Sequence, residues 1–132
     1  MINILIIDPN IPFQQSLKKL LLKHFPHVCV EVAASGPEGL GKINAFGPQF
    51  ILLEIHLPDN SGLDLAGQVK SAHPEAIIAL LTSYNSPEYE IAAKNAGIEH
   101  LIPKDEWTGD DIVGLVQSIV SDLEKQHHGE SE

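Results

Sequence analysis

The sequence contains no arginine, so its eight basic side chains are all lysines. Eighteen Asp and Glu side chains outnumber them and give a formal net charge of −10 at pH 7. Arginine supplies the bidentate contacts to phosphates and to guanine, and an acidic surface repels the nucleic-acid backbone. We therefore expect no direct binding to nucleic acid. The charge points to no particular partner, because solvated carboxylates on helix faces also keep a domain soluble.

Long apolar runs and paired cysteines are missing as well. No stretch approaches the roughly 20 apolar residues that cross a bilayer, so we expect no membrane contact of that kind. The N-terminal residues MINILIID have neither the basic region nor the cleavage site of a signal peptide, which predicts a cytoplasmic protein. Cys29 is the only cysteine and forms no internal disulfide. A chain of 132 residues is long enough for one domain with one core.

Five short apolar runs recur along the chain, and each has the length of a β-strand. They are residues 4–7, 28–33, 50–53, 77–81 and 98–102. Several are continuously hydrophobic, which is typical of strands buried on both faces of a parallel sheet.

Segments of helical length separate these runs, and most begin with an N-capping signal. The signals are Ser35 with Glu38, Ser61 with Asp64, Ser86 before Pro87, and Thr108 with Asp111. We expect the first helix over residues 13–25, the fourth to end at Ala96 before Gly97, and the last to bury a face from 112 to 123. Five alternations of strand and helix predict an α/β fold with a doubly wound parallel sheet, (βα)5, and helices on both faces. We place the domain at residues 1–125 and a flexible tail at 126–132.

Polar side chains follow four of the predicted strands. They are Asp8, Glu54, Thr82 with Ser83, and Lys104. In open α/β sheets, ligands bind outside the carboxyl ends of the strands, near the point where the strand order reverses. We therefore expect these acids, hydroxyls and the lysine to share one edge of the sheet and to form the functional site.

These motifs resemble the receiver domain of two-component response regulators, and the resemblance extends over residues 4–123. The motifs are ILIID at 4–8, FILLEIHLPDNSG at 50–62, ALLTS at 79–83 and AGIEHLIPKD at 96–105. The resemblance implies a flavodoxin-like fold with strand order 2-1-3-4-5. It also implies signal transduction in a phosphorelay rather than enzymatic activity.

In that family an aspartate at the position of Glu54 takes a phosphoryl group from a histidine kinase. Mg²⁺ assists, held by two acids at the end of the first strand and by the aspartate itself. The resemblance assigns Asp8 to the acidic pocket, Thr82 or Ser83 to the switch hydroxyl, and Lys104 to the lysine that neutralises phosphate oxygens.

The chain departs from the family pattern at three positions. Glu54 replaces the aspartate, and its extra methylene moves the carboxylate by about 1.5 Å, which positional catalysis tolerates poorly. Pro9 replaces the second acid, which leaves Asp8 and Glu54 as ligands for Mg²⁺, weakly bound at most, and no firmly expected cofactor. Leu101 stands where the family has a switch aromatic.

The preferred hypothesis is a pseudo-receiver that is not phosphorylated at Glu54 and acts by protein contact. The resemblance places that contact on the fourth helix, fifth strand and fifth helix. The expected partners are a histidine kinase, an output protein, another receiver, or a second copy of the chain. On this hypothesis Glu54 mimics phosphate. A decayed site, in which Glu54 and Lys104 only neutralise each other, remains open.

Two other functions remain as alternatives. The first is a conventional phosphoreceiver that uses an atypical acceptor such as Asp8. The second is a flavodoxin-like cofactor domain, which the sequence disfavours because residues 8–12 offer no Gly, Ser or Thr cradle for phosphate. The sequence does not decide whether the chain is a whole protein or part of a longer regulator.

Overall fold

The computed structural model describes residues 1–59, 61–83 and 86–130. Strands and helices alternate through these ranges. In chain order they are β1 (Asn3–Ile7), α1 (Ile11–His24), β2 (Cys29–Ala33), α2 (Gly36–Phe46), β3 (Phe50–Glu54), α3 (Gly62–Ala72), β4 (Ile77–Thr82), α4 (Pro87–Asn95), β5 (His100–Pro103) and α5 (Gly109–Glu130). All paired strands run parallel in the order β2-β1-β3-β4-β5, which confirms the predicted fold and strand order.

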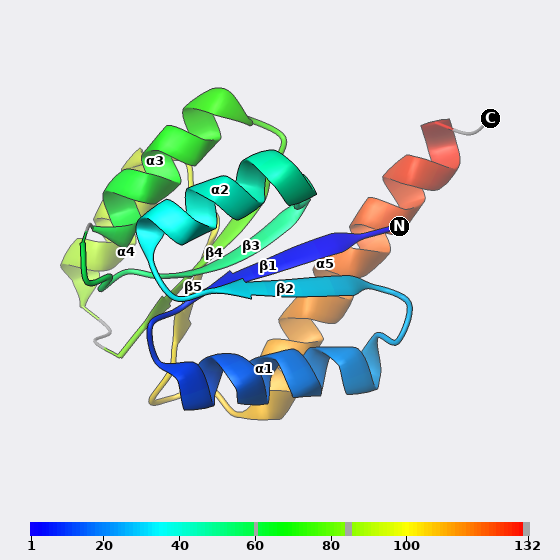
Figure 1. Cartoon of the computed structure of the whole chain (residues 1–132), viewed down its shortest axis with the longest axis horizontal. Helices are drawn as coiled ribbons and strands as arrows, with labels where there is room; N and C mark the ends of the chain where they lie inside the picture. The colour runs from blue at the N-terminus through cyan, green and yellow to red at the C-terminus, as the bar shows by residue number, and fades with distance from the viewer. Residues whose placement is uncertain (60, 84–85, 131–132) are drawn as a thin grey trace.

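The sheet is covered on both faces, with α1 and α5 on one side and α2, α3 and α4 on the other (Figure 1). Each face has its own apolar core. The core beneath α1 and α5 includes Leu21 and Val116, and the core on the opposite face includes Ile43 and Leu65. All five residues of β3 are buried, which explains why residues 50–53 form a continuous apolar run in the sequence, and the fifth residue is the buried carboxylate Glu54.

The predicted N-caps are at the predicted places, and three of the four work through their side chains. Ser35 and Ser86 each accept a hydrogen bond from a backbone N–H in the first turn of their helix. Thr108 and Asp111 form a reciprocal capping box, with N···O distances of 2.8 and 3.2 Å. Ser61 occupies the N-cap position, but its side chain makes no capping hydrogen bond. For that helix the predicted start is correct and the predicted mechanism is wrong.

Three element boundaries differ from the sequence prediction by two residues or more, and the others that differ do so by one residue. The helix α1 starts at Ile11, two residues early, because the Asn10 side chain accepts a hydrogen bond from the backbone N–H of residue 13. The strand β5 starts at His100 rather than 98, because Gly97 has a positive φ of 79° and the Ile98 N–H bonds back to α4. The helix α5 continues to Glu130, past the predicted boundary at 125. The division into a domain and a flexible tail stays a prediction.

Candidate functional site

The structure brings Asp8, Glu54 and Lys104 together at the carboxyl edge of the sheet. Asp8 follows β1 directly, Glu54 is the last residue of β3, and these two strands are neighbours. Lys104 follows β5, and its backbone N–H donates to the Thr82 carbonyl oxygen at 2.7 Å. The two acids and the lysine therefore share one edge of the sheet, as expected from the sequence.

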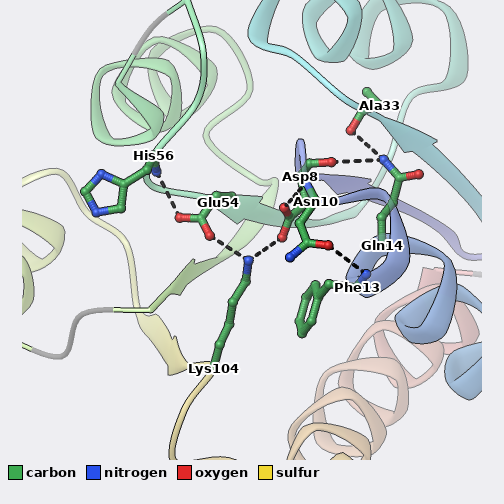
Figure 2. Close-up of polar contacts among 8 residues, drawn as sticks. All are labelled: Asp8, Asn10, Phe13, Gln14, Ala33, Glu54, His56 and Lys104. Atoms are coloured by element: carbon green, nitrogen blue, oxygen red, sulfur yellow. Dashed lines mark hydrogen bonds and ion pairs between the residues drawn. The ribbon is translucent and has the colours of Figure 1, made fainter.

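The Lys104 ammonium lies between the two carboxylates (Figure 2). Its Nζ is 2.6 Å from Asp8 Oδ2 and 2.6 Å from Glu54 Oε1. The side chains are 10%, 1% and 6% exposed for Lys104, Asp8 and Glu54, so the group is almost closed to solvent. Backbone N–H groups bind the other two carboxylate oxygens, from Asn10 to Asp8 Oδ1 at 2.8 Å and from His56 to Glu54 Oε2 at 2.9 Å.

The contact between Asp8 and Lys104 is a close ion pair with poor hydrogen-bond geometry. Asp8 Oδ2 is buried and accepts no well-directed hydrogen bond, although the ammonium lies beside it. The contact from Lys104 to Glu54 meets both the distance and the angular requirement. Glu54 is therefore the better hydrogen-bond partner of Lys104, whereas the contact between Asp8 Oδ2 and Lys104 is chiefly an attraction of opposite charges.

Burial disfavours the charged form of both Asp8 and Lys104, but the other contacts outweigh this effect only for Lys104. Burial by itself lowers the pKa of Lys104, but the close contacts with Asp8 and Glu54 and the negative charge of both carboxylates outweigh it and raise that pKa above 10.5. Burial raises the pKa of Asp8 above 3.8, and the contacts with Lys104 and Asn10 only partly offset this increase. The site therefore stabilises the charged form of Lys104, whereas desolvation destabilises the charged form of Asp8, as is common for buried ion pairs.

Two residues of α1 support the site, and the sequence analysis did not identify either. The Gln14 side chain is buried and donates from Nε2 to the carbonyl oxygens of Asp8 and Ala33, at 3.1 and 3.0 Å. The Phe13 ring lies 4.3 Å from Lys104 Nζ, close enough for a cation–π contact. Spacing was the available signal for Gln14, because it is three residues before the buried Leu17 and so shares the core-facing side of the helix.

The loop between β3 and α3 folds tightly against the site. The Gly62 N–H donates to the Ile55 carbonyl oxygen at 2.7 Å, and a Cβ at residue 62 would be 2.9 Å from the carbonyl carbon of Glu54. His56 extends from this loop to α4, where its Nε2 lies 3.3 Å from the Tyr89 hydroxyl and the two rings meet edge to face. The backbone that binds Glu54 is thus connected to α4.

The remaining predicted site residues lie on β4, directly after β4, and on β5. Thr82 is fully buried at the end of β4, and the neighbouring Ser83 is exposed. Leu101 is half-buried in β5 and packs against the core beneath α4. The roles that the family resemblance assigns to these three residues stay predictions.

The residues present do not fit a magnesium site. Mg²⁺ prefers about six oxygen ligands in octahedral geometry, yet Pro9 offers no side-chain oxygen next to Asp8. Within residues 1–59, 61–83 and 86–130, no three His, Cys, Asp or Glu side chains gather where they could hold one metal ion. The space between the Asp8 and Glu54 oxygens is taken by the Lys104 ammonium.

The parallel sheet carries two acids and a lysine at its carboxyl edge, as the motif resemblance led us to expect, and sequence comparison identifies the family. Residues 4–117 match the response regulator receiver domain, and the chain belongs to this family. The resemblance stated from the motifs is thereby confirmed. The chain is a receiver domain of two-component signalling.

Curated relatives are longer than this chain. The response regulator MprA of Mycolicibacterium vanbaalenii is 29% identical over 103 residues, which cover 78% of this chain and 44% of that protein. The transcriptional regulatory protein YdfI of Bacillus subtilis is 28% identical over 102 residues, or 77% of this chain and 47% of that protein. The chain thus spans less than half the length of these two relatives.

Solved structures agree with the fold along almost the whole chain. A CheY-like receiver domain protein from Methanospirillum hungatei superposes with a TM-score of 0.85 at 29% identity, covering 96% of this chain and 98% of that one. A response regulator from Burkholderia pseudomallei, solved with a phosphorylated aspartic acid, calcium ion and citrate, gives a TM-score of 0.79 at 26% identity. That comparison covers 100% of this chain and 76% of the other.

Proposed function

We propose that this receiver domain signals without phosphorylation at the position of Glu54, whose carboxylate acts as a permanent negative charge beside Lys104. One observation carries the proposal. Glu54 Oε1 lies 2.6 Å from Lys104 Nζ in a nearly closed site, so the lysine already has an anionic partner. In the family, as the motif resemblance implies, this lysine neutralises the oxygens of the phosphoryl group.

Both carboxylate oxygens of Glu54 are engaged, which supports the same conclusion. Oε1 accepts from Lys104, and Oε2 accepts from the His56 backbone N–H. An attacking oxygen would have to give up one of these contacts. It would also start from a position displaced by one methylene, and group transfer depends strongly on alignment.

The proposed output is contact with other proteins through the face of α4, β5 and α5. The chain of contacts from Glu54 through His56 to Tyr89 supports this choice, because it connects the charged site with α4. The partners we expect are a histidine kinase, an output protein, another receiver or a second copy of this chain. A cytoplasmic location and the absence of enzymatic activity belong to the same proposal. In the part of the chain that the structure describes, no helix is long and apolar enough to cross a membrane.

One observation favours a second candidate, phosphorylation at an atypical acceptor. Asp8 Oδ2 is buried, lacks a well-directed hydrogen bond and belongs to an aspartate, the residue type that the family uses. This candidate makes the domain a conventional phosphoreceiver with a displaced site. It requires Asp8 Oδ2 to give up its contact with the Lys104 ammonium, whose Nζ lies 2.6 Å from it.

Intact-mass spectrometry after incubation with acetyl phosphate and Mg²⁺ separates the candidates. The wild type, Glu54→Asp and Asp8→Asn are compared under the same conditions. We expect no phosphoryl adduct on the wild type. An adduct on Glu54→Asp alone would identify the extra methylene as the block. An adduct on the wild type that is lost in Asp8→Asn would replace the proposal by the second candidate.

A further inference from the structure

We infer that Lys104 is the resident cation of this site and occupies the place of a divalent metal ion between Asp8 and Glu54. The consequence is a latent metal site, which becomes available to Mn²⁺, Mg²⁺ or Ca²⁺ only when the ammonium is removed. This inference deepens the proposed function, since it concerns the same three side chains and takes Glu54 to be permanently unphosphorylated.

The two carboxylates around the Lys104 ammonium support its role as their counter-ion. Two nearly buried carboxylates face one another across Lys104 Nζ, each with an oxygen 2.6 Å from it. Their outer oxygens are bound by the backbone N–H groups of Asn10 and His56. The ammonium therefore supplies the positive charge that faces both buried carboxylates.

Lys104 is also held in place at both ends, at its backbone N–H and at its ammonium group. Its backbone N–H is fastened to the carbonyl oxygen of Thr82, and its Nζ lies 4.3 Å from the centre of the Phe13 ring. A divalent ion could enter only by moving this side chain, which is 10% exposed, away from both carboxylates and from the ring. The wild-type site is therefore closed to metals.

A metal ion gains too little to displace the lysine. Pro9 carries no oxygen in its side chain, so Asp8 and Glu54 offer one facing oxygen each, and water would have to supply most of the remaining ligands. Mg²⁺ normally takes about six oxygen ligands at roughly 2.1 Å. A nearly closed site lined by a lysine and a phenyl ring is poorly suited to bring in that many waters.

Removing the ammonium should make binding of a divalent cation favourable. Asp8 Oδ2 and Glu54 Oε1 both lie 2.6 Å from one point, and calcium–oxygen distances are about 2.3–2.6 Å. Asp8 Oδ2 has no other partner with good hydrogen-bond geometry, so it would face the vacated space unsatisfied. Truncation to alanine also makes room for water ligands. The variant Lys104→Ala should therefore bind divalent cations that the wild type excludes.

The test compares wild type, Lys104→Ala and a control, Lys42→Ala, all freed of metal. Lys42 forms an ion pair of 2.8 Å with Glu31, but both side chains are well exposed, so its removal should open no cation site. Mn²⁺ binding is measured by electron paramagnetic resonance. Melting temperatures are recorded with Mn²⁺, Mg²⁺, Ca²⁺, or NaCl of equal ionic strength.

We expect wild type and Lys42→Ala to show no site-specific Mn²⁺ binding and no metal-dependent shift in melting temperature. Lys104→Ala should melt below the wild type and recover by about 5 °C when Mn²⁺ is at roughly ten times its Kd, with no such recovery in NaCl. If Lys104→Ala is unfolded in chelator, adding Mn²⁺ should fold it.

Two results would overturn the inference. One is Mn²⁺ binding to the wild type that is lost in Asp8→Asn. The other is a Lys104→Ala variant, folded or unfolded, that does not respond to any of the three cations. No phosphoryl donor is present in these experiments. A wild type that binds Mn²⁺ yet gains no phosphate would refute the resident-cation inference and leave the proposed function standing.

Discussion

Replacing Gly62 with alanine tests how closely the loop after β3 packs against the residue that carries the site's charge. A Cβ at residue 62 would lie 2.7 Å from Ile55 Cα and 2.9 Å from the carbonyl carbon of Glu54, and closer still to that carbonyl's oxygen. All of these are backbone atoms, so no side chain can rotate away. Overpacking costs about 1–3 kcal/mol. The lack of a flexible neighbour places Gly62→Ala near the upper end, at about 3 kcal/mol of lost stability.

Gly67 in the same helix provides a matched control. A Cβ there would meet nothing within 4 Å, so Gly67→Ala should increase helix stability by about 0.5–1 kcal/mol. Urea unfolding at neutral pH, followed by far-ultraviolet circular dichroism, measures both free energies of unfolding. The two variants should shift the unfolding midpoint in opposite directions from the wild type.

Equal stability of Gly62→Ala and wild type would refute this reasoning. It would mean that the loop moves away from the end of β3 at no cost, and that the backbone hydrogen bond from His56 to Glu54 does not depend on a closely packed loop. A destabilised Gly67→Ala would show instead that alanine substitution in α3 is harmful for a reason unrelated to the site.

Three further predictions concern the residues around the site. Because folding raises the pKa of Lys104, the charged lysine should stabilise the protein fully below pH 10.5, and this stabilisation should be lost as the pH rises above that value. Urea unfolding at a series of alkaline pH values measures the loss. Gln14→Leu should cost about 1–3 kcal/mol, because two strand-end carbonyls lose a buried donor. Gln15→Leu should cost less in the same assay, because the exposed Gln15 side chain contributes one hydrogen bond, of 3.1 Å to Gln14 Oε1. Thr108→Ala should cost about 1 kcal/mol in thermal melts by removing the N-cap of α5; an unchanged melting temperature would contradict the capping box.

The sheet was predictable because its central strands, β1, β3 and β4, are buried on both faces. The run FILL, residues 50–53 of β3, is wholly buried, so it leaves an uninterrupted hydrophobic signal in the sequence. Boundaries were less predictable where an apolar residue belongs to a helix cap. Ile98 is buried and reads as the start of a strand, yet its N–H bonds to Ala93 at the end of α4. Hydrophobicity alone does not separate these two environments.

The meeting of Asp8, Glu54 and Lys104 was predictable from topology, since the carboxyl ends of parallel strands share one edge. The bridging position of the ammonium was not, because it depends on the side-chain conformation of a long, flexible residue. Gln14 and Phe13 were missed for a related reason. Their contacts depend on where α1 packs across the sheet, and a strand-end rule contains no information about that.

The central claim is that the charge of Glu54, rather than a phosphoryl group, sets the state of this receiver. The most direct test compares amide proton–nitrogen NMR spectra of the wild type and Glu54→Gln, which keeps the side-chain shape and removes the charge. The account predicts shifts at residue 54 and its neighbours that continue into α4 and β5, along the contact between His56 and Tyr89. Shifts confined to the immediate neighbours of residue 54 would contradict it, and would identify the ion pair with Lys104 as the remnant of a decayed site.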